Sequence, residues 1–181
     1  MRHHSGIAVL TLVGFLSCAT SSRATRSDAL DTEAIREFLA NGLEANKAMD
    51  IDFARAIPDS ALRWAPTPDV RDFAQQIAHA ADNSWIASGL GVEARAFGDT
   101  AVVLNDKEAL VAAVTAAYDW MLGTLRDLPD DQFTAEGDFF GTPTPRWRMF
   151  MQAIEHATWT RGQLVGYFHA HGVPVPRVRF F

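Results

Sequence analysis

Apolar residues recur at three- and four-residue steps in four separate stretches, and this spacing is what most restricts the fold of the chain. Such a period places apolar side chains along one side of an α-helix, whereas a half-buried strand would need strict alternation. The four predicted helices span about residues 29–57, 67–89, 105–128 and 144–171. The sequence therefore predicts an all-α protein and gives no convincing strand.

Residues that favour helix ends stand at the boundaries of these stretches. Thr67 and Thr144 are each followed by proline, and threonine suits the N-cap while proline suits the first helical position. Asn105 opens a spacing typical of a capping box. Pro58 ends the first stretch, and Gly172 supplies a C-cap after the last.

Two connections are longer than a tight turn between antiparallel helices needs. They cover residues 58–66 and 91–104, and the second would reach about 45 Å if it were extended. A helix of about 20 residues is only about 30 Å long, so one or both connections can cross the whole bundle. We therefore expect a four-helix bundle with long crossover connections. Residues 101–104 fit a short extended segment inside the second crossover.

Composition is that of one ordinary globular domain. The chain has 181 residues, of which 48% are hydrophobic and 21% charged. The net charge of −6 and the lack of any run of lysine or arginine argue against a nucleic-acid partner.

The first 18 residues have the anatomy of a secretory signal. Arg2 and two histidines precede an apolar run at residues 7–16, which is too short to span a bilayer as a helix. Cys18 is the single cysteine, and together with Ser17 it resembles a bacterial lipobox, in which the cysteine becomes the lipidated N-terminus. Cleavage at a small-x-small site within residues 17–19 or 22–24 is the alternative.

Both alternatives predict an exported protein. Ala19, rather than aspartate, after Cys18 favours an anchor in the outer membrane facing the periplasm, so membrane contact would come through the lipid alone. Residues 19–28 (ATSSRATRSD) are predicted to form a flexible tether, and residues 29–181 the folded domain. No cysteine remains in that domain to form a disulfide.

Two histidines within the predicted helices are candidate functional residues. His156 shares a helical face with apolar residues and with Gln152, Thr160 and Gln163, where a histidine is more often a core residue than a ligand. His79 lies off the apolar stripe of its helix, so it faces either solvent or a polar cleft. Periodicity leaves both questions open.

Other candidate residues have simpler explanations. His169 and His171 suit the last turn of a helix, where they complement the dipole. Spacing singles out none of the carboxylates, and no HExxH motif, nucleophile elbow or phosphate-binding loop is present. Three aromatic residues offer a surface for a homodimer contact on the last helix: Trp147, Phe150 and Trp159.

Two segments together point to a known family. The first reads LRWAPTPDVRDF over residues 62–73 and leads to His79; the second reads HATWTRGQL over residues 156–164, then continues to Tyr167 and to GVP at 172–174. Their order and spacing resemble the DinB/YfiT-like superfamily of four-helix bundles. In that pattern one histidine lies on the second helix, and the last helix carries His-x3-His-Arg-Gly-Gln-Leu.

The resemblance is strong over residues 61–85 and 154–176, and thin over residues 29–57 and 106–128. It implies an up-up-down-down bundle that is often dimeric. It also implies a divalent metal, commonly nickel or zinc, held by three histidines with water completing the shell. Characterised relatives include transferases and isomerases that use low-molecular-weight thiols.

The resemblance assigns ligand positions to His79, His156 and Thr160. Thr160 departs from the pattern, because a histidine belongs there and a threonine hydroxyl is a poor ligand for zinc or nickel. Asn83, Gln163 and Tyr167 are expected to line the adjoining cleft.

Three functions remain as predictions. We expect first an exported, non-catalytic or weakly metal-binding protein that binds a small molecule or a protein partner in the envelope. The alternative is a metal-dependent hydrolase or thiol-dependent transferase that uses His79 and His156, with Glu155 or Asp82 as a substitute third ligand. A purely structural helical domain is the third.

Overall fold

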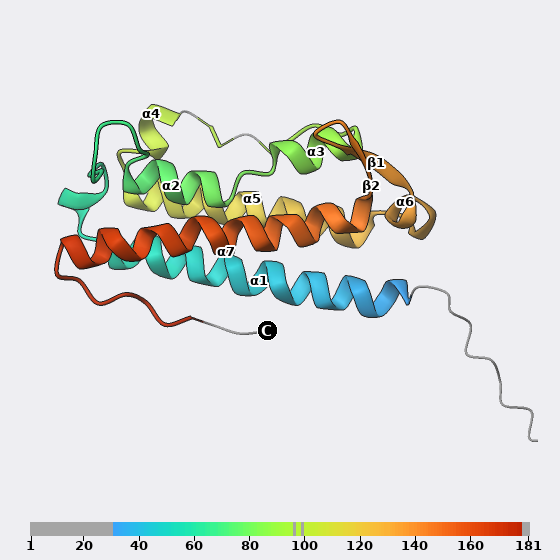
Figure 1. The fold of residues 1–181 in the computed structure, drawn as a ribbon, viewed down its shortest axis with the longest axis horizontal. Helices are drawn as coiled ribbons and strands as arrows, with labels where there is room; N and C mark the ends of the chain where they lie inside the picture. Colours follow the sequence, from blue (N-terminus) through green and yellow to red (C-terminus); the bar gives the residue numbers. More distant parts are fainter. Residues whose placement is uncertain (1–30, 96, 99, 179–181) are drawn as a thin grey trace, which may run out of the picture. The chain divides into compact units, whose positions relative to one another are not determined.

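The structure, a computed structural model, describes residues 31–95, 97–98 and 100–178. The predicted signal segment, Cys18 and the tether at 19–28 lie outside these residues. The described residues form a helical bundle, which confirms the all-α prediction (Figure 1). Its long segments are α1 (Thr32–Ala56), the pair α2 (Phe73–Ala80) and α3 (Ser84–Leu90), α5 (Lys107–Asp127), and α7 (Arg146–Ala170).

Shorter elements connect these segments. They are the 3-10 turn η1 (Asp59–Ala61), the helices α4 (Thr100–Val103) and α6 (Asp130–Thr134), and the strands β1 (Glu136–Phe139) and β2 (Thr142–Pro145). Residues 101–104, expected to be extended, instead lie largely in α4, where Val103 is buried. None of the helices in the described part of the chain is long and apolar enough to cross a membrane.

Side-chain contacts fix the directions of the helices. The Arg36 guanidinium near the start of α1 donates to the Leu125 carbonyl near the end of α5, whereas Lys107 at the start of α5 donates to the Ile57 carbonyl. These two helices are therefore antiparallel, while α7 runs parallel to α1 and antiparallel to α2. The order is up-down-down-up, so the expected up-up-down-down order is wrong. Residues 91–106 cross the bundle, but residues 57–72 join antiparallel neighbours.

The second predicted helix begins later than expected and is broken in two. Thr67-Pro68 does not start it; instead Asp72 and Gln75 form a reciprocal capping box, with Asp72 Oδ1 accepting from the Gln75 amide at 2.8 Å. The helix ends after Ala80, and α3 starts where Asp82 Oδ1 accepts from the Ser84 amide at 2.9 Å. The local side-chain bonds at both ends therefore outweigh the continuous apolar periodicity.

The start of the last helix also differs from the prediction. Thr144-Pro145 belongs to β2, which pairs antiparallel with β1, and α7 begins at Arg146. The turn between the strands consists of Phe140 (φ +51°) and Gly141 (φ +82°), the two positive values of a type I′ hairpin. Glycine adopts such values freely, but they cost another residue roughly 1 kcal/mol. Similarly, Asp106 rather than Asn105 caps α5.

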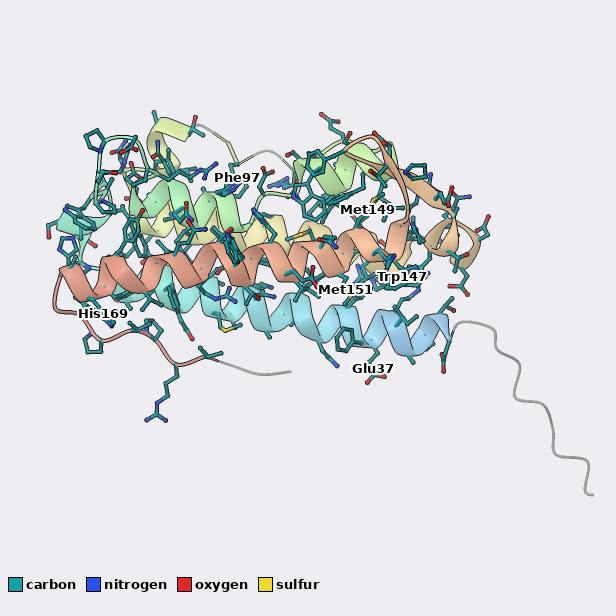
Figure 2. All side chains as sticks on the ribbon, viewed as in Figure 1. Glu37, Phe97, Trp147, Met149, Met151 and His169 are labelled. Carbon is teal, nitrogen blue, oxygen red and sulfur yellow. The ribbon has the colours of Figure 1, made fainter. Side chains whose placement is uncertain are left out.

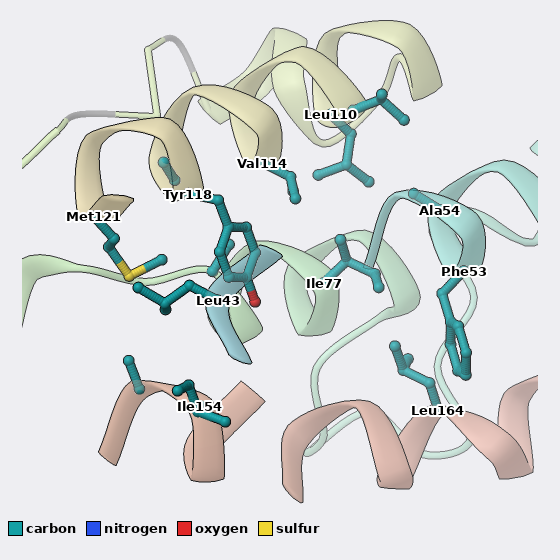
Figure 3. Close-up of a cluster of buried hydrophobic side chains, with 14 of the residues drawn as sticks. Leu43, Phe53, Ala54, Ile77, Leu110, Val114, Tyr118, Met121, Ile154 and Leu164 are labelled. Carbon is teal, nitrogen blue, oxygen red and sulfur yellow. The ribbon is translucent and has the colours of Figure 1, made fainter. Parts of the chain in front are cut away.

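The core lies between the four long segments, and Figure 3 shows the part contributed by α1, α2, α5 and α7. Phe150 is fully buried there, and Trp147 is partly buried against the core. The expected dimer surface on α7 therefore loses Phe150, while Trp147 offers only part of its surface. Trp159 remains, with 74% of its surface exposed.

A buried polar network joins α1, α5 and α7 inside this core. Arg161 donates to Asp50 Oδ1 and to Asn46 Oδ1, both at 2.6 Å, and the Tyr118 hydroxyl donates to Asp50 Oδ2 at 2.7 Å. Burial raises the pKa of Asp50 above its ordinary value of 3.8, although Arg161 opposes the shift. The network ties three helices in one register.

Candidate functional site

A seam of polar side chains runs along the antiparallel contact between α2 and α7. At one end the Tyr167 hydroxyl donates to the Arg71 carbonyl at 2.6 Å. One to two turns further along, the Gln76 amide donates to Gln163 Oε1 at 2.9 Å and to the Thr160 carbonyl at 3.3 Å. Because the helices are antiparallel, the next pair along the seam is His79 with His156.

The two histidines meet through their Nε2 atoms, which lie 3.2 Å apart, with the ring planes nearly perpendicular. One of these nitrogens must carry the proton and the other accept it. The Thr160 hydroxyl lies 3.4 Å from His156 Nε2, and Thr160 is 1% exposed. All three positions that the family resemblance assigned to a metal site therefore converge.

The surroundings favour neutral imidazoles. Burial is the largest cause that lowers the pKa of His79 below its ordinary 6.5, with the Arg71 and His156 charges adding to it and Asp82 opposing. Burial likewise lowers the pKa of His156, against the opposing charge of Asp82. A neutral ring keeps one Nε2 lone pair available for a proton, a hydrogen-bond donor or a metal.

A pocket of about 340 Å³ opens beside the histidine pair. It is lined by His79, Asp82, Ser84, Trp85, Phe139, Phe140, Gln152 and His156. The expected lining residues Gln163 and Tyr167 instead border a second pocket of about 440 Å³ at the Arg71 end of the seam. Asn83 is buried, and its side-chain nitrogen has no hydrogen-bond partner among the described residues.

A larger hollow of about 620 Å³ lies between α1 and the end of α5. Its lining is acidic and basic surface residues with apolar ones between them, and it contains no histidine. Ligand sites combine an apolar wall with a few converging polar groups. The pocket beside the histidine pair meets that description better, despite its smaller volume.

Comparison with known proteins agrees with this architecture. The sequence profile of the DinB superfamily matches residues 43–164. The chain belongs to the DinB superfamily. A crystal structure of a DinB-like protein from Bacillus cereus matches with a TM-score of 0.59, covering 79% of this chain and 97% of that one at 19% identity. That likeness bears on the fold alone, and no curated protein matches the sequence.

The donor set of this DinB protein falls short of the three-histidine metal site that the resemblance implied. Two nitrogens bound to one zinc ion lie roughly 3.3 Å apart, so the 3.2 Å between the Nε2 atoms suits two ligands of one metal. However, no group of three histidine, cysteine, aspartate or glutamate side chains in the described residues could hold a metal ion. Glu155 is exposed on α7, and Asp82 Oδ1 is bonded to the Ser84 amide.

The surroundings of the second ring nitrogen of His156 support the same conclusion. Nδ1 of His156 is buried and has no hydrogen-bond partner among the described residues. A histidine that binds a metal normally donates its other N–H to a carboxylate or carbonyl, which fixes the tautomer. The residues present therefore fit a shared proton or a hydrogen-bonded ligand better than a tightly held transition metal.

The sequence did not lead us to predict the aromatic wall of the pocket, which consists of Trp85, Phe139 and Phe140. Trp85 on α3 contacts Phe139 on β1 (ring centroids 5.4 Å apart), and Phe139 contacts Phe140 in the turn (4.9 Å). Trp85 also lies 6.5 Å from the His156 ring. The usable signal was Phe-Phe-Gly at 139–141, which is compatible with the turn of a hairpin, but Thr144-Pro145 suggested a helix start.

Two glycines let this wall form. A Cβ on Gly137 of β1 would lie 2.3 Å from the Gly89 carbonyl oxygen on α3, so the hairpin can approach α3 only without a side chain there. The Met149 side chain of α7, labelled in Figure 2, would also lie within 3 Å of a Cβ added at either Gly89 or Gly137. Close packing of three elements thus holds Phe139 against Trp85.

Proposed function

We propose that this DinB-superfamily protein is an exported binding protein whose ancestral metal site has lost one ligand. It binds a small molecule in the pocket beside His79 and His156, and it holds divalent metal only weakly. The observation that carries the proposal is the convergence of two imidazoles with the Thr160 hydroxyl, at the wall of a pocket of about 340 Å³.

The chemistry of the donors supports this reading. Catalytic zinc sites commonly use three protein ligands and leave one position open. Two imidazoles and a hydroxyl provide fewer strong donors, so metal affinity should fall by orders of magnitude. The same groups can donate and accept hydrogen bonds, which a polar ligand needs when it enters a largely apolar pocket.

Export rests on the sequence of the first 18 residues. The lipobox-like Cys18 would anchor the protein to the outer membrane by lipid, and the tether at 19–28 would let the bundle extend into the periplasm. A homodimer through α7 is part of the same proposal, with the exposed Trp159 as its contact.

Metal content of the protein purified without a histidine tag tests the proposal. We expect zinc and nickel well below one ion per chain in wild type, with no further loss in His156→Ala. One ion per chain that disappears in His156→Ala would contradict the proposal. It would favour the alternative, a metal-dependent hydrolase or thiol-dependent transferase. The Nε2–Nε2 distance of 3.2 Å is the observation in favour of that alternative.

A further inference from the structure

The aromatic side chains beside the histidine pair are set at steep angles to one another. The rings of Trp85 and Phe139 make an angle of 75°, and those of Phe139 and Phe140 make an angle of 71°. Rings at such angles form corners that contact a rounded group on more than one side. A flat ligand would instead stack between parallel rings.

The charge of the residues that line the pocket decides which ligands of rounded shape it favours. Asp82 is the one acidic residue of the lining, and the lining contains no lysine or arginine. Aromatic rings attract cations through their negative faces, and an adjoining carboxylate adds to that attraction. We propose that the pocket binds a compact organic cation, of the quaternary or methylated ammonium class, between the aromatic corner and Asp82. This inference rests on the proposed function and names its ligand class.

Phe140 is the residue whose presence the fold does not explain. It occupies a left-handed position in the hairpin turn (φ +51°), where asparagine or glycine is favoured, and it is 79% exposed. A large apolar side chain thus stands in solvent, in a strained backbone conformation, at the mouth of the pocket. A cation held at that mouth would be contacted by the ring.

Two compounds of the same shape separate the effect of charge from the effect of shape. One is choline, and the other is dimethylbutanol, the neutral analogue in which carbon replaces the quaternary nitrogen. We would titrate each into the full chain by calorimetry after the protein has been treated with a chelator. Choline should bind roughly tenfold more tightly than dimethylbutanol, because cation–π attraction distinguishes the two. Equal affinities, or no binding of choline, would overturn the proposal.

Two variants and a control locate the site. Phe140→Asn should weaken choline binding about threefold to tenfold while leaving the melting temperature unchanged or raising it, because asparagine accepts the turn conformation. Asp82→Asn keeps the oxygen that caps Ser84 and should weaken choline but not dimethylbutanol. Phe38→Ala, at a half-exposed aromatic residue of α1 outside the pocket lining, should change neither. Choline affinity that is unchanged in both pocket variants would place the binding elsewhere and refute the assignment.

Metal analysis of the same preparation before chelation distinguishes a failure of the proposed function from a failure of the proposed cation binding. One metal ion per chain counts against the proposed function, whatever choline does. A metal-poor protein that shows no preference for choline counts against the cation alone. Preference for choline that is lost in Phe140→Asn supports the ligand class.

Discussion

Arg161 and Asp50 form an ion pair in the centre of the bundle, with side chains 6% and 0% exposed. A charge in such a place is stabilised only by its partners, because water no longer solvates it. Tyr118 and Asn46 complete those partners, so no member of the network can be removed without leaving another unsatisfied.

Arg161→Ala should therefore lower the free energy of unfolding by about 3–5 kcal/mol, since it leaves Asp50 buried and unpaired. Urea denaturation of both proteins would measure the difference. Arg126→Ala is the matched control, because its ion pair with Asp127 is largely exposed and should contribute no more than about 1 kcal/mol. Equal effects of the two substitutions would mean that the network contributes little to stability.

The loss in Arg161→Ala should also depend on pH. Burial already raises the pKa of Asp50 in the folded state, and without Arg161 the pKa should rise further. A raised pKa contributes stability that is present below the unfolded value of 3.8 and is lost as the pH rises through the folded value. Denaturation of the variant across the acidic range should show a smaller loss at low pH than at neutral pH.

In the metal-free wild-type protein, His79 and His156 should make the free energy of unfolding depend on pH in the opposite direction. Their folded pKa values lie below 6.5, so the unfolded chain binds more protons in that range. The free energy of unfolding should fall as the pH drops below 6.5 and level off below the folded pKa values. Replacing both residues with glutamine should flatten the profile. An unchanged slope in that double variant would assign it to other groups.

At the scale of elements, the hairpin determines the shape of the pocket. Gly137→Ala would place a Cβ 2.3 Å from the Gly89 carbonyl oxygen, which should force β1 away from α3 and cost about 1–3 kcal/mol. Thermal unfolding would measure the loss. Gly162→Ala is the control in the middle of α7, where the added Cβ meets open space and should stabilise the helix by up to about 1 kcal/mol. Destabilisation in the control but not at Gly137 would contradict this packing.

The long helices could be predicted from periodicity, because each buries one apolar stripe against the others. The break between α2 and α3 could not, since it depends on which side chain reaches a free amide: Asp72 and Asp82 do so, and Thr67 does not. The hairpin was missed for a related reason. Thr144-Pro145 suits a helix start and an edge strand equally well, and only pairing with residues 136–139 decides between them.

For the whole molecule, the family pattern predicted the convergence of His79, His156 and position 160 better than spacing did. Helical periodicity gives the face of one helix, and the contact of two faces depends on how the helices pack. The order of helix directions that the family resemblance implied was wrong, and the connection lengths could not correct it, because both connections are long enough for a crossover. The aromatic wall depends on the hairpin, so it could not be predicted when the hairpin was not.

Cys18→Ser tests the proposed anchor of the whole protein. If Cys18 is lipidated, the wild type should fractionate with membranes and the variant should move to the periplasmic extract, because one residue carries the lipid. Immunoblots of fractionated cells would show the change, with Ser17→Ala, a small residue at the same site, as the control that keeps the anchor. A variant that stays with the membranes would contradict the lipoprotein assignment.

The zinc affinity of Thr160→His tests the central claim most directly. A histidine there would add a third imidazole beside His156, so zinc affinity, measured by competition with a chromogenic chelator, should rise by roughly 100-fold or more. Gly162→His, which adds the same ring to α7 six residues from His156, where a side chain meets open space, should leave the affinity near that of wild type. No gain in Thr160→His, or tight zinc binding already in wild type, would contradict the account of a metal site that lacks one ligand.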